Sequence, residues 1–322
     1  LTLAEEALEE QMLLRAAFYY RAAEFYLLAE MPEKQLLYDK FSTLFYQAVE
    51  DDNVERFSVP YDAAFLPVMK VPSIGRTKST IVMHGGFDSF IEEFYSMMRF
   101  FAQHGYEVIA FEGPGQGAAR RKYGLAFDLE WEKPVRAVLD YFNLNDVTLL
   151  GLSLGGWLCL RASAFEPRVT RVIATGHAID YMKSMNAVLR WVHLWFFEHC
   201  RGFMERMAEK KFQKENIATW MVKHLMYITK KEKPLDALET YLLMNEENIH
   251  SELVTQDALI MLGRKDHFIP FKMLDMQVKA LTNAKSVTAK IFTKEEHAQN
   301  HCQVGNIGLS LDIMLKWIEE IS

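Results

Sequence analysis

One serine lies in a sequence context that would make it a nucleophile. Ser153 is at the centre of Gly151-Leu152-Ser153-Leu154-Gly155, which matches the pattern G-x-S-x-G. The apolar run 147–150 before it predicts a buried strand, and the run 156–162 after it predicts a helix. Strand, motif and helix together predict a nucleophile elbow, a strained turn that exposes the serine hydroxyl. The chemistry that this pattern indicates is attack of a hydroxyl on a carbonyl carbon.

A serine hydroxyl needs a general base and an acid that orients this base. The chain supplies both in the order serine, acid, histidine. Asp266 follows the predicted strand 258–262, and Asp180 is the alternative acid. Two histidines, His297 and His301, follow the last predicted strand. The base usually sits in the loop before the last helix, which favours His301 and leaves His297 as the alternative base.

Backbone amides must also hold the oxyanion that forms during such an attack. The amide of Leu154, directly after the serine, is one expected donor. The second is expected from His84-Gly85-Gly86-Phe87, where either Gly86 or Phe87 would supply it. We expect His84 to stabilise this loop and not to act as a base. This chemistry requires no metal and no organic cofactor.

The segment 113–118 is rich in glycine, with the sequence Gly-Pro-Gly-Gln-Gly-Ala, and could be interpreted as a dinucleotide-binding loop. Pro114 stiffens the loop, the preceding strand is not the first of a βαβ unit, and no acidic residue closes a second strand about twenty residues later. We therefore interpret this segment as a loop at the strand ends, beside the predicted oxyanion loop.

The composition indicates an ordinary globular protein. The chain has 322 residues, of which 50% are hydrophobic and 25% charged, and a net charge of −7 with no basic stripe, which argues against nucleic-acid binding. The three cysteines are an odd number without metal-type spacing, so a reducing cytoplasm is the expected location. The sequence has no signal-peptide pattern and no apolar run that predicts a membrane span.

The pattern of predicted elements divides the chain into three parts. Residues 1–53 are expected to form a helical hairpin that breaks near Pro32. Strands alternate with helices over 54–178 and 251–322, which predicts an α/β fold with a mostly parallel central sheet and helices on both faces. The interval 179–250 has no convincing strand and is rich in methionine and aromatic residues, so we expect a helical lid over the strand ends.

Several segments together resemble the α/β-hydrolase superfamily over residues 54–322. The chain looks most like the branch of acylaminoacyl-peptidase-like and dipeptidyl-aminopeptidase-like hydrolases, related to 2,6-dihydroxypseudooxynicotine hydrolase. The matching segments are 84–89, 113–117, the Ser153 elbow, Asp266 and 295–306. The last segment in that branch reads E-E-G-A-x-x-H-C-Q-x-G-N, so His301 stands at the family histidine and His297 at a family glycine. The resemblance implies a Ser153, Asp266 and His301 triad.

The expected function is hydrolysis by acyl transfer from Ser153 to water. The lid, rich in methionine and aromatic residues, favours a small to medium, partly apolar substrate. A carboxylic ester is the substrate class that we expect first. Two other enzyme activities are alternatives. One is a peptidase or amidase that cleaves an amide or a short peptide, and the other is hydrolysis of a C–C bond in a diketone. A non-catalytic scaffold that binds a partner through its helices is the alternative from another class. A homodimer through the lid or the N-terminal helices remains an open alternative.

Overall fold

The computed structural model describes residues 1–211 and 216–321, and the chain divides into two compact units. The first unit contains residues 1–55 and 194–240, and the second contains residues 56–193 and 241–322. The sequence assigned 179–250 as a whole to the lid, whereas 179–193 and 241–250 fall in the second unit. The prediction that this interval covers the strand ends stays a prediction.

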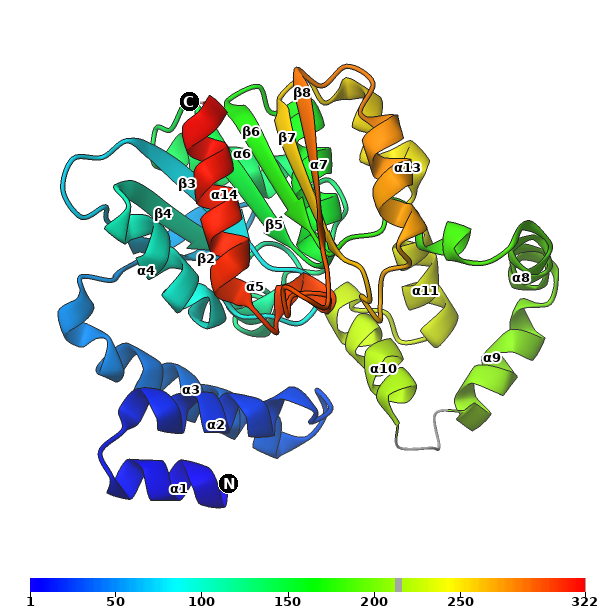
Figure 1. The fold of residues 1–322 in the computed structure, drawn as a ribbon. Helices are drawn as coiled ribbons and strands as arrows, with labels where there is room; N and C mark the ends of the chain where they lie inside the picture. Colours follow the sequence, from blue (N-terminus) through cyan, green and yellow to red (C-terminus); the bar gives the residue numbers. More distant parts are fainter. Residues whose placement is uncertain (212–215, 322) are drawn as a thin grey trace. The chain divides into compact units, whose positions relative to one another are not determined.

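The second unit is built on an eight-stranded sheet (Figure 1). Its strand order is β1-β2-β4-β3-β5-β6-β7-β8, and β2 is antiparallel to β4, while β4, β3, β5, β6, β7 and β8 pair in parallel. The strands are β1 Glu55–Tyr61, β2 Ala64–Val71, β3 Ser79–His84, β4 Tyr106–Phe111, β5 Val147–Leu152, β6 Val169–Thr175, β7 Asp257–Gly263 and β8 Ser286–Phe292. Every residue of β5 and β7 is buried, as expected of central parallel strands covered on both faces.

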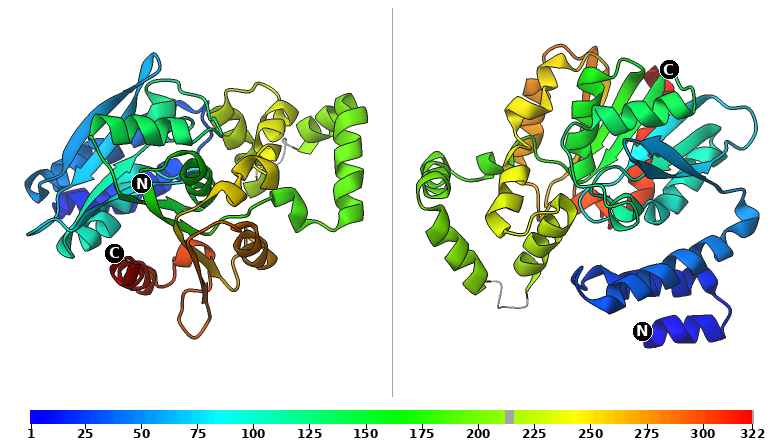
Figure 2. Two further views of the ribbon diagram at one scale, coloured as in Figure 1. Left: turned by 90° about the horizontal axis from the view of Figure 1, so that it is seen from above. Right: turned by 180° about the vertical axis from the view of Figure 1, so that it is seen from behind.

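Helices cover both faces of this sheet (Figures 1 and 2). The helices α4 and α14 lie together on one face, and α6 and α7 lie together on the other. The α-helices wholly within this unit are α4 Tyr95–Gln103, α5 Gly117–Arg121, α6 Glu132–Tyr141, α7 Leu154–Phe165, α12 Glu246–Ile249, α13 Lys272–Ala280 and α14 Ile307–Ile321. Its short 3₁₀ helices are η2 Ile91–Phe94, η3 Tyr181–Ser184, η4 Ser251–Leu253 and η5 His301–Gln303. The predicted α/β fold with a mostly parallel sheet is confirmed.

The first unit is helical. It contains α1 Thr2–Glu9, α2 Leu13–Phe25, α3 Pro32–Ala48, η1 Glu50–Asp52, α9 Arg201–Lys211 and α10 Ile217–Thr229. The helices α8 Ala187–His199 and α11 Pro234–Leu242 extend across the boundaries between the units. The predicted N-terminal hairpin corresponds to α2 and α3, but a third helix, α1, precedes it. The first helix ends at Glu9, and Gln11, whose backbone is left-handed with a φ of 57°, lies in the turn before α2 begins at Leu13.

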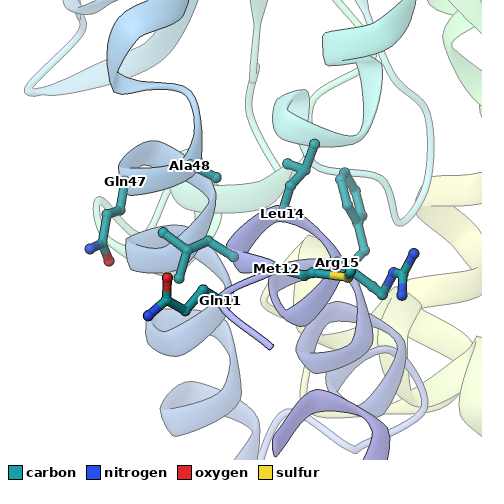
Figure 3. Close-up of a pocket in the computed structure, with 8 residues that line it drawn as sticks. Gln11, Met12, Leu14, Arg15, Gln47 and Ala48 are labelled. Carbon is teal, nitrogen blue, oxygen red and sulfur yellow. The ribbon is translucent and has the colours of Figure 1, made fainter. Parts of the chain in front are cut away.

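Residues far apart in the sequence meet within the first unit. The indole of Trp220 on α10 stacks on the ring of Phe25 at a centroid distance of 5.0 Å. Its Nε1–H also donates a hydrogen bond to the carbonyl oxygen of Phe25 at 3.1 Å. A groove of about 620 Å³ lies where the start of α2 meets the end of α3 (Figure 3). None of the residues that line it is a predicted site residue.

Candidate active site

The backbone of Ser153 has the strained geometry expected of a nucleophile elbow. The residue follows β5 and precedes α7, and its φ of 58° and ψ of −126° lie outside the regions that non-glycine residues usually adopt. The two glycines of the motif are required by close approach. A Cβ at Gly151 would lie 2.0 Å from the carbonyl oxygen of Gly155, and a Cβ at Gly155 would lie 2.4 Å from that of Gly85. The turn therefore cannot form with larger residues at either position.

The structure joins the three predicted side chains in a chain of hydrogen bonds. His301 Nε2 lies 2.8 Å from Ser153 Oγ, and His301 Nδ1 lies 2.7 Å from Asp266 Oδ2. The three residues come from the ends of β5 and β7 and from η5, which precedes α14. Because the carboxyl ends of parallel strands meet at one edge of a sheet, residues 148 positions apart come into contact.

Asp266 uses both carboxylate oxygens. Its Oδ1 accepts hydrogen bonds from the backbone amides of Phe268 and Ile269, each at 2.9 Å, which fixes the plane of the carboxylate. Its Oδ2 faces His301, and the carboxylate side chain is fully buried. A buried carboxylate held in this way can fix the tautomer of the imidazole, with the proton on Nδ1 and the lone pair of Nε2 toward Ser153.

Two opposing effects act on the pKa of His301. Burial lowers it, whereas the hydrogen bond to Asp266 and the neighbouring Cys302 thiol raise it, and the net direction is upward from 6.5. The ring also packs against Phe268, with a centroid distance of 5.1 Å. The upward direction means that the carboxylate of Asp266 stabilises the protonated imidazole, the form that exists after the serine hydroxyl has given up its proton.

The loop that carries His301 is anchored to the nucleophile strand through Thr175 at the end of β6. The carbonyl oxygen of Thr175 accepts the amide of Ser153 at 2.8 Å, and its hydroxyl donates to Gln303 Oε1 at 2.8 Å. Gln303 is fully buried, and its Oε1 also accepts from the hydroxyl of Ser310 on α14 at 3.3 Å. Cys302 and Gln303 have left-handed φ values of 47° and 55°. These hydrogen bonds hold a strained turn directly after the imidazole.

The predicted oxyanion loop approaches the elbow closely. A Cβ at Gly86 would lie 2.7 Å from the amide nitrogen of Leu154, so a side chain at this position would collide with the backbone. Leu154 is the first residue of α7, and its amide therefore has no acceptor within the helix. The amide of Gly86 donates to Ser89 Oγ at 3.3 Å. The two predicted donor segments, 86–87 and Leu154, thus lie next to each other.

The alternative site residues occupy other places. His297 is exposed in a turn, with a left-handed φ of 56°. Asp180 accepts the amides of Met182 and Lys183 at the start of η3, and the hydrogen bond to His301 comes from Asp266. His84 is buried between Phe111 and Trp131, and burial lowers its pKa to about 4. The structure thus brings His301 and Asp266 to Ser153 and leaves the alternatives outside this chain of hydrogen bonds.

Three residues that contact the site were not among those predicted from the sequence: Thr175, Gln303 and Gln116. Gln303 lies in the His-Cys-Gln-x-Gly-Asn part of the segment that resembles the family, and Gln116 lies in the glycine-rich loop, so both had a sequence signal. Within residues 1–211 and 216–321, the structure contains no cluster of three His, Cys, Asp or Glu side chains suited to a metal ion. In the same residues, no helix combines the length and the apolar character that a membrane span needs.

A serine, a histidine and an aspartate at the carboxyl edge of a mostly parallel sheet define the class of α/β-hydrolase-fold proteins. The model of the alpha/beta hydrolase family matches residues 81–289, and the chain belongs to this family. The peptidase-like branch of the superfamily stays a prediction.

Fungal proteins are among the relatives in sequence. The chain is 29% identical to hydrolase acrC of Aspergillus aculeatus over 267 residues, which cover 70% of this chain and 60% of that protein. It is 24% identical to alpha/beta hydrolase psoB of Aspergillus fumigatus, over 95% of this chain and 77% of that protein. The chain thus spans about 60% of the length of acrC, and likewise about 60% of hydrolase LUC6 of a Fusarium species.

Solved structures share the fold. The crystal structure of 2,6-dihydroxy-pseudo-oxynicotine hydrolase aligns with a TM-score of 0.73 and 22% identity, over 98% of this chain and 83% of that one. The structure of AbyA5 aligns with a TM-score of 0.74 and 17% identity, over 98% of this chain and 85% of that one. At these identities the similarity establishes the fold alone.

Proposed function

We propose that this chain is a serine hydrolase that cleaves a carboxylic ester of a small to medium, partly apolar molecule through an acyl-enzyme. The observation that carries the proposal is the chain of hydrogen bonds from Ser153 Oγ to His301 and on to Asp266. The strained elbow supports it, because such backbone geometry is costly and is found mainly where it serves a function. The family membership supports hydrolysis as the reaction type.

The first half of the reaction forms the acyl-enzyme. His301 Nε2 takes the proton of Ser153 while Oγ bonds to the carbonyl carbon of the ester. The negative charge moves to the carbonyl oxygen, which the amides of Leu154 and of the loop 86–87 receive. The C–O bond to the alcohol then breaks, and the alcohol oxygen takes the proton from His301. Asp266 holds the imidazolium throughout and does not accept its proton.

The second half releases the acid. A water molecule gives a proton to His301 and attacks the acyl carbon. The bond to Ser153 Oγ breaks, and Oγ recovers the proton from the imidazolium. Ester and water are thereby converted to acid and alcohol, with the protein unchanged and no other reactant required. A panel of p-nitrophenyl esters of increasing chain length defines the preferred acyl group.

Replacement of the nucleophile tests the proposal. Ser153→Ala is expected to lower kcat on p-nitrophenyl esters on the order of 10⁶-fold, since such effects follow loss of a catalytic serine. The melting temperature should stay nearly unchanged, because the variant loses a single hydroxyl. Ser184→Ala, at an exposed serine in the same unit, serves as the control and should retain full turnover. Turnover by Ser153→Ala at the rate of the control would overturn the assignment.

A further inference from the structure

The glycine-rich loop 113–117 contains a buried glutamine that the reaction described above does not use. Gln116 is 4% exposed and precedes α5. Its Nε2 donates to two carbonyl oxygens of the predicted oxyanion loop, that of Gly85 at 2.8 Å and that of Gly86 at 3.0 Å. Its Oε1 accepts the amide of Gly113 at 3.0 Å. One side chain therefore connects two loops that are 30 residues apart in the sequence.

These two acceptors determine where the loop amides point. A peptide unit is planar and trans, so its C=O and N–H bonds point in opposite directions. The carbonyl of Gly86 and the amide of Phe87 belong to one such unit. When Gln116 holds the carbonyl on one side, the amide of Phe87 is directed to the opposite side. The carbonyl of Gly85 likewise sets the amide of Gly86, which donates to Ser89 Oγ.

We propose that Gln116 is a positioning residue that aims the amide of Phe87 at the oxyanion beside Leu154. This inference rests on the proposed serine hydrolase function and adds two things to it. It assigns the second oxyanion donor to Phe87, because the carbonyl that Gln116 holds at Gly86 belongs to the same peptide unit as the amide of Phe87. It also gives the glycine-rich loop a role, since the turn at 113–117 brings the glutamine against the oxyanion loop.

A second connection joins the same two segments. The carboxyl group of Glu112 is buried, and it accepts the amide of Ala118 at 2.6 Å and the amide of Ile91 at 3.3 Å. Ile91 begins the helix η2 that follows the oxyanion loop, and Ala118 belongs to α5. Glu112 thus connects the segments that follow the two loops, and Gln116 connects the loops themselves through the carbonyl oxygens of Gly85 and Gly86.

The test compares Gln116→Met with a matched buried glutamine. Gln256 is 7% exposed, donates to the carbonyl oxygen of Ser163 at 2.8 Å and accepts the amide of Thr255 at 2.9 Å, next to the amino end of β7. Gln256→Met therefore loses the same kind of bridge at a place remote in the sheet from Ser153. Both variants are measured for melting temperature, for kcat and KM on the best p-nitrophenyl ester, and for affinity toward an aryl trifluoromethyl ketone.

Gln116→Met is expected to lower kcat about 100-fold, with KM within threefold, as for loss of one oxyanion donor. Its affinity for the trifluoromethyl ketone, which forms a tetrahedral oxyanion on Ser153, should fall in parallel. Gln256→Met should lose stability but keep both values within threefold. Equal stability losses with unchanged kcat and ketone affinity in both variants would overturn the positioning role.

Gln116→Glu provides a second variant of nearly the same size. Its carboxylate still accepts the amide of Gly113 but donates to neither carbonyl. Its kcat relative to the unmodified chain should rise as pH falls, because a protonated carboxyl group regains one donor. A pH-independent ratio would contradict the proposal. A chain that turns over no ester before any substitution overturns the proposed function itself, whereas failure of the positioning role appears solely in the Gln116 variants.

Discussion

At the scale of single residues, the proposed mechanism depends on which histidine serves as the base. His301 lies within hydrogen-bond distance of both Ser153 and Asp266, whereas His297 is exposed in a turn. The backbone at His297 is left-handed, which fits the glycine found at this position in the pattern E-E-G-A-x-x-H-C-Q-x-G-N. A residue without Cβ adopts a φ of 56° without steric cost. The histidine at position 297 in place of glycine thus changes the turn and does not affect His301, whose imidazole contacts Ser153.

Substitutions at the two histidines are expected to separate these roles. His301→Ala should lower kcat by several orders of magnitude, because Ser153 loses its proton acceptor. His297→Gly should leave kcat within twofold and raise the free energy of unfolding by roughly 0.5 kcal/mol, since relief of left-handed strain exceeds the extra entropy of glycine in the unfolded chain. Steady-state kinetics and urea unfolding measure both effects. A larger loss of activity in His297→Gly than in His301→Ala would show that His301 is not the base.

At the scale of elements, Thr175 couples two parts of the site. Its carbonyl oxygen accepts the amide of Ser153, and its hydroxyl donates to Gln303 in the turn after His301. A change in this single residue is therefore expected to alter the distance between Ser153 and His301. The two parts come from elements separated by more than a hundred residues, so their relative position depends on such cross-connections.

Thr175→Val removes the hydroxyl while keeping the shape of the side chain. We expect kcat to fall about 10-fold with KM within threefold, and the free energy of unfolding to fall by about 1–2 kcal/mol for a buried acceptor that loses a donor. Thr148→Val is the matched control, because Thr148 is equally buried on the neighbouring strand β5 and its hydroxyl accepts from Arg171 at 3.0 Å. Loss of kcat in the control to the same extent would argue against coupling through Thr175.

The elements show what local patterns can and cannot predict. The elbow was predictable because its glycines, its serine and the flanking apolar runs are adjacent in the sequence. Asp266 and His301 were predictable because each follows a strand in the order that the fold requires. Gln116 and Gln303 lie in segments that the sequence singles out, but their hydrogen bonds, like those of Thr175, join distant loops and were not predictable from local patterns. The helix α1 was also missed, because Gln11 breaks the helical run without being a proline or glycine.

At the scale of the whole molecule, the helical parts form a unit of their own. The stacking and hydrogen bond between Phe25 and Trp220 join segments 195 residues apart, so the N-terminal helices and α10 share one core. No local sequence pattern indicates such a pairing. The α/β unit has a separate core, which includes the buried strands β5 and β7. The division of the chain therefore follows packing and not the order of segments along the sequence.

The stability of the molecule is expected to depend on pH through Glu112. Burial and the nearby Glu92 carboxylate raise the pKa of Glu112 to about 8, although the amides of Ala118 and Ile91 and the charge of Arg121 act in the opposite direction. Between pH 4.5 and 8 the folded state then binds more protons at this site than the unfolded state. The contribution of this site to the free energy of unfolding therefore falls as pH rises through this window.

Glu112→Gln removes this titration. The difference in the free energy of unfolding, variant minus unmodified chain, should increase by a few kcal/mol from pH 5 to pH 8, because one pKa unit corresponds to about 1.4 kcal/mol. Urea unfolding at intervals of pH measures the two curves. Curves that stay parallel over this range would mean that Glu112 does not carry a raised pKa.

The proposed role of Ser153 as nucleophile is tested by identifying the residue that a fluorophosphonate modifies. The reagent reacts with a serine hydroxyl that a neighbouring imidazole has activated, and mass spectrometry of the digested protein locates the adduct. We expect one adduct per chain on Ser153, formed rapidly in the unmodified chain and in His297→Ala, and abolished in His301→Ala. A folded chain that carries no adduct on Ser153, or one that labels equally fast without His301, would contradict the proposed roles of these two residues.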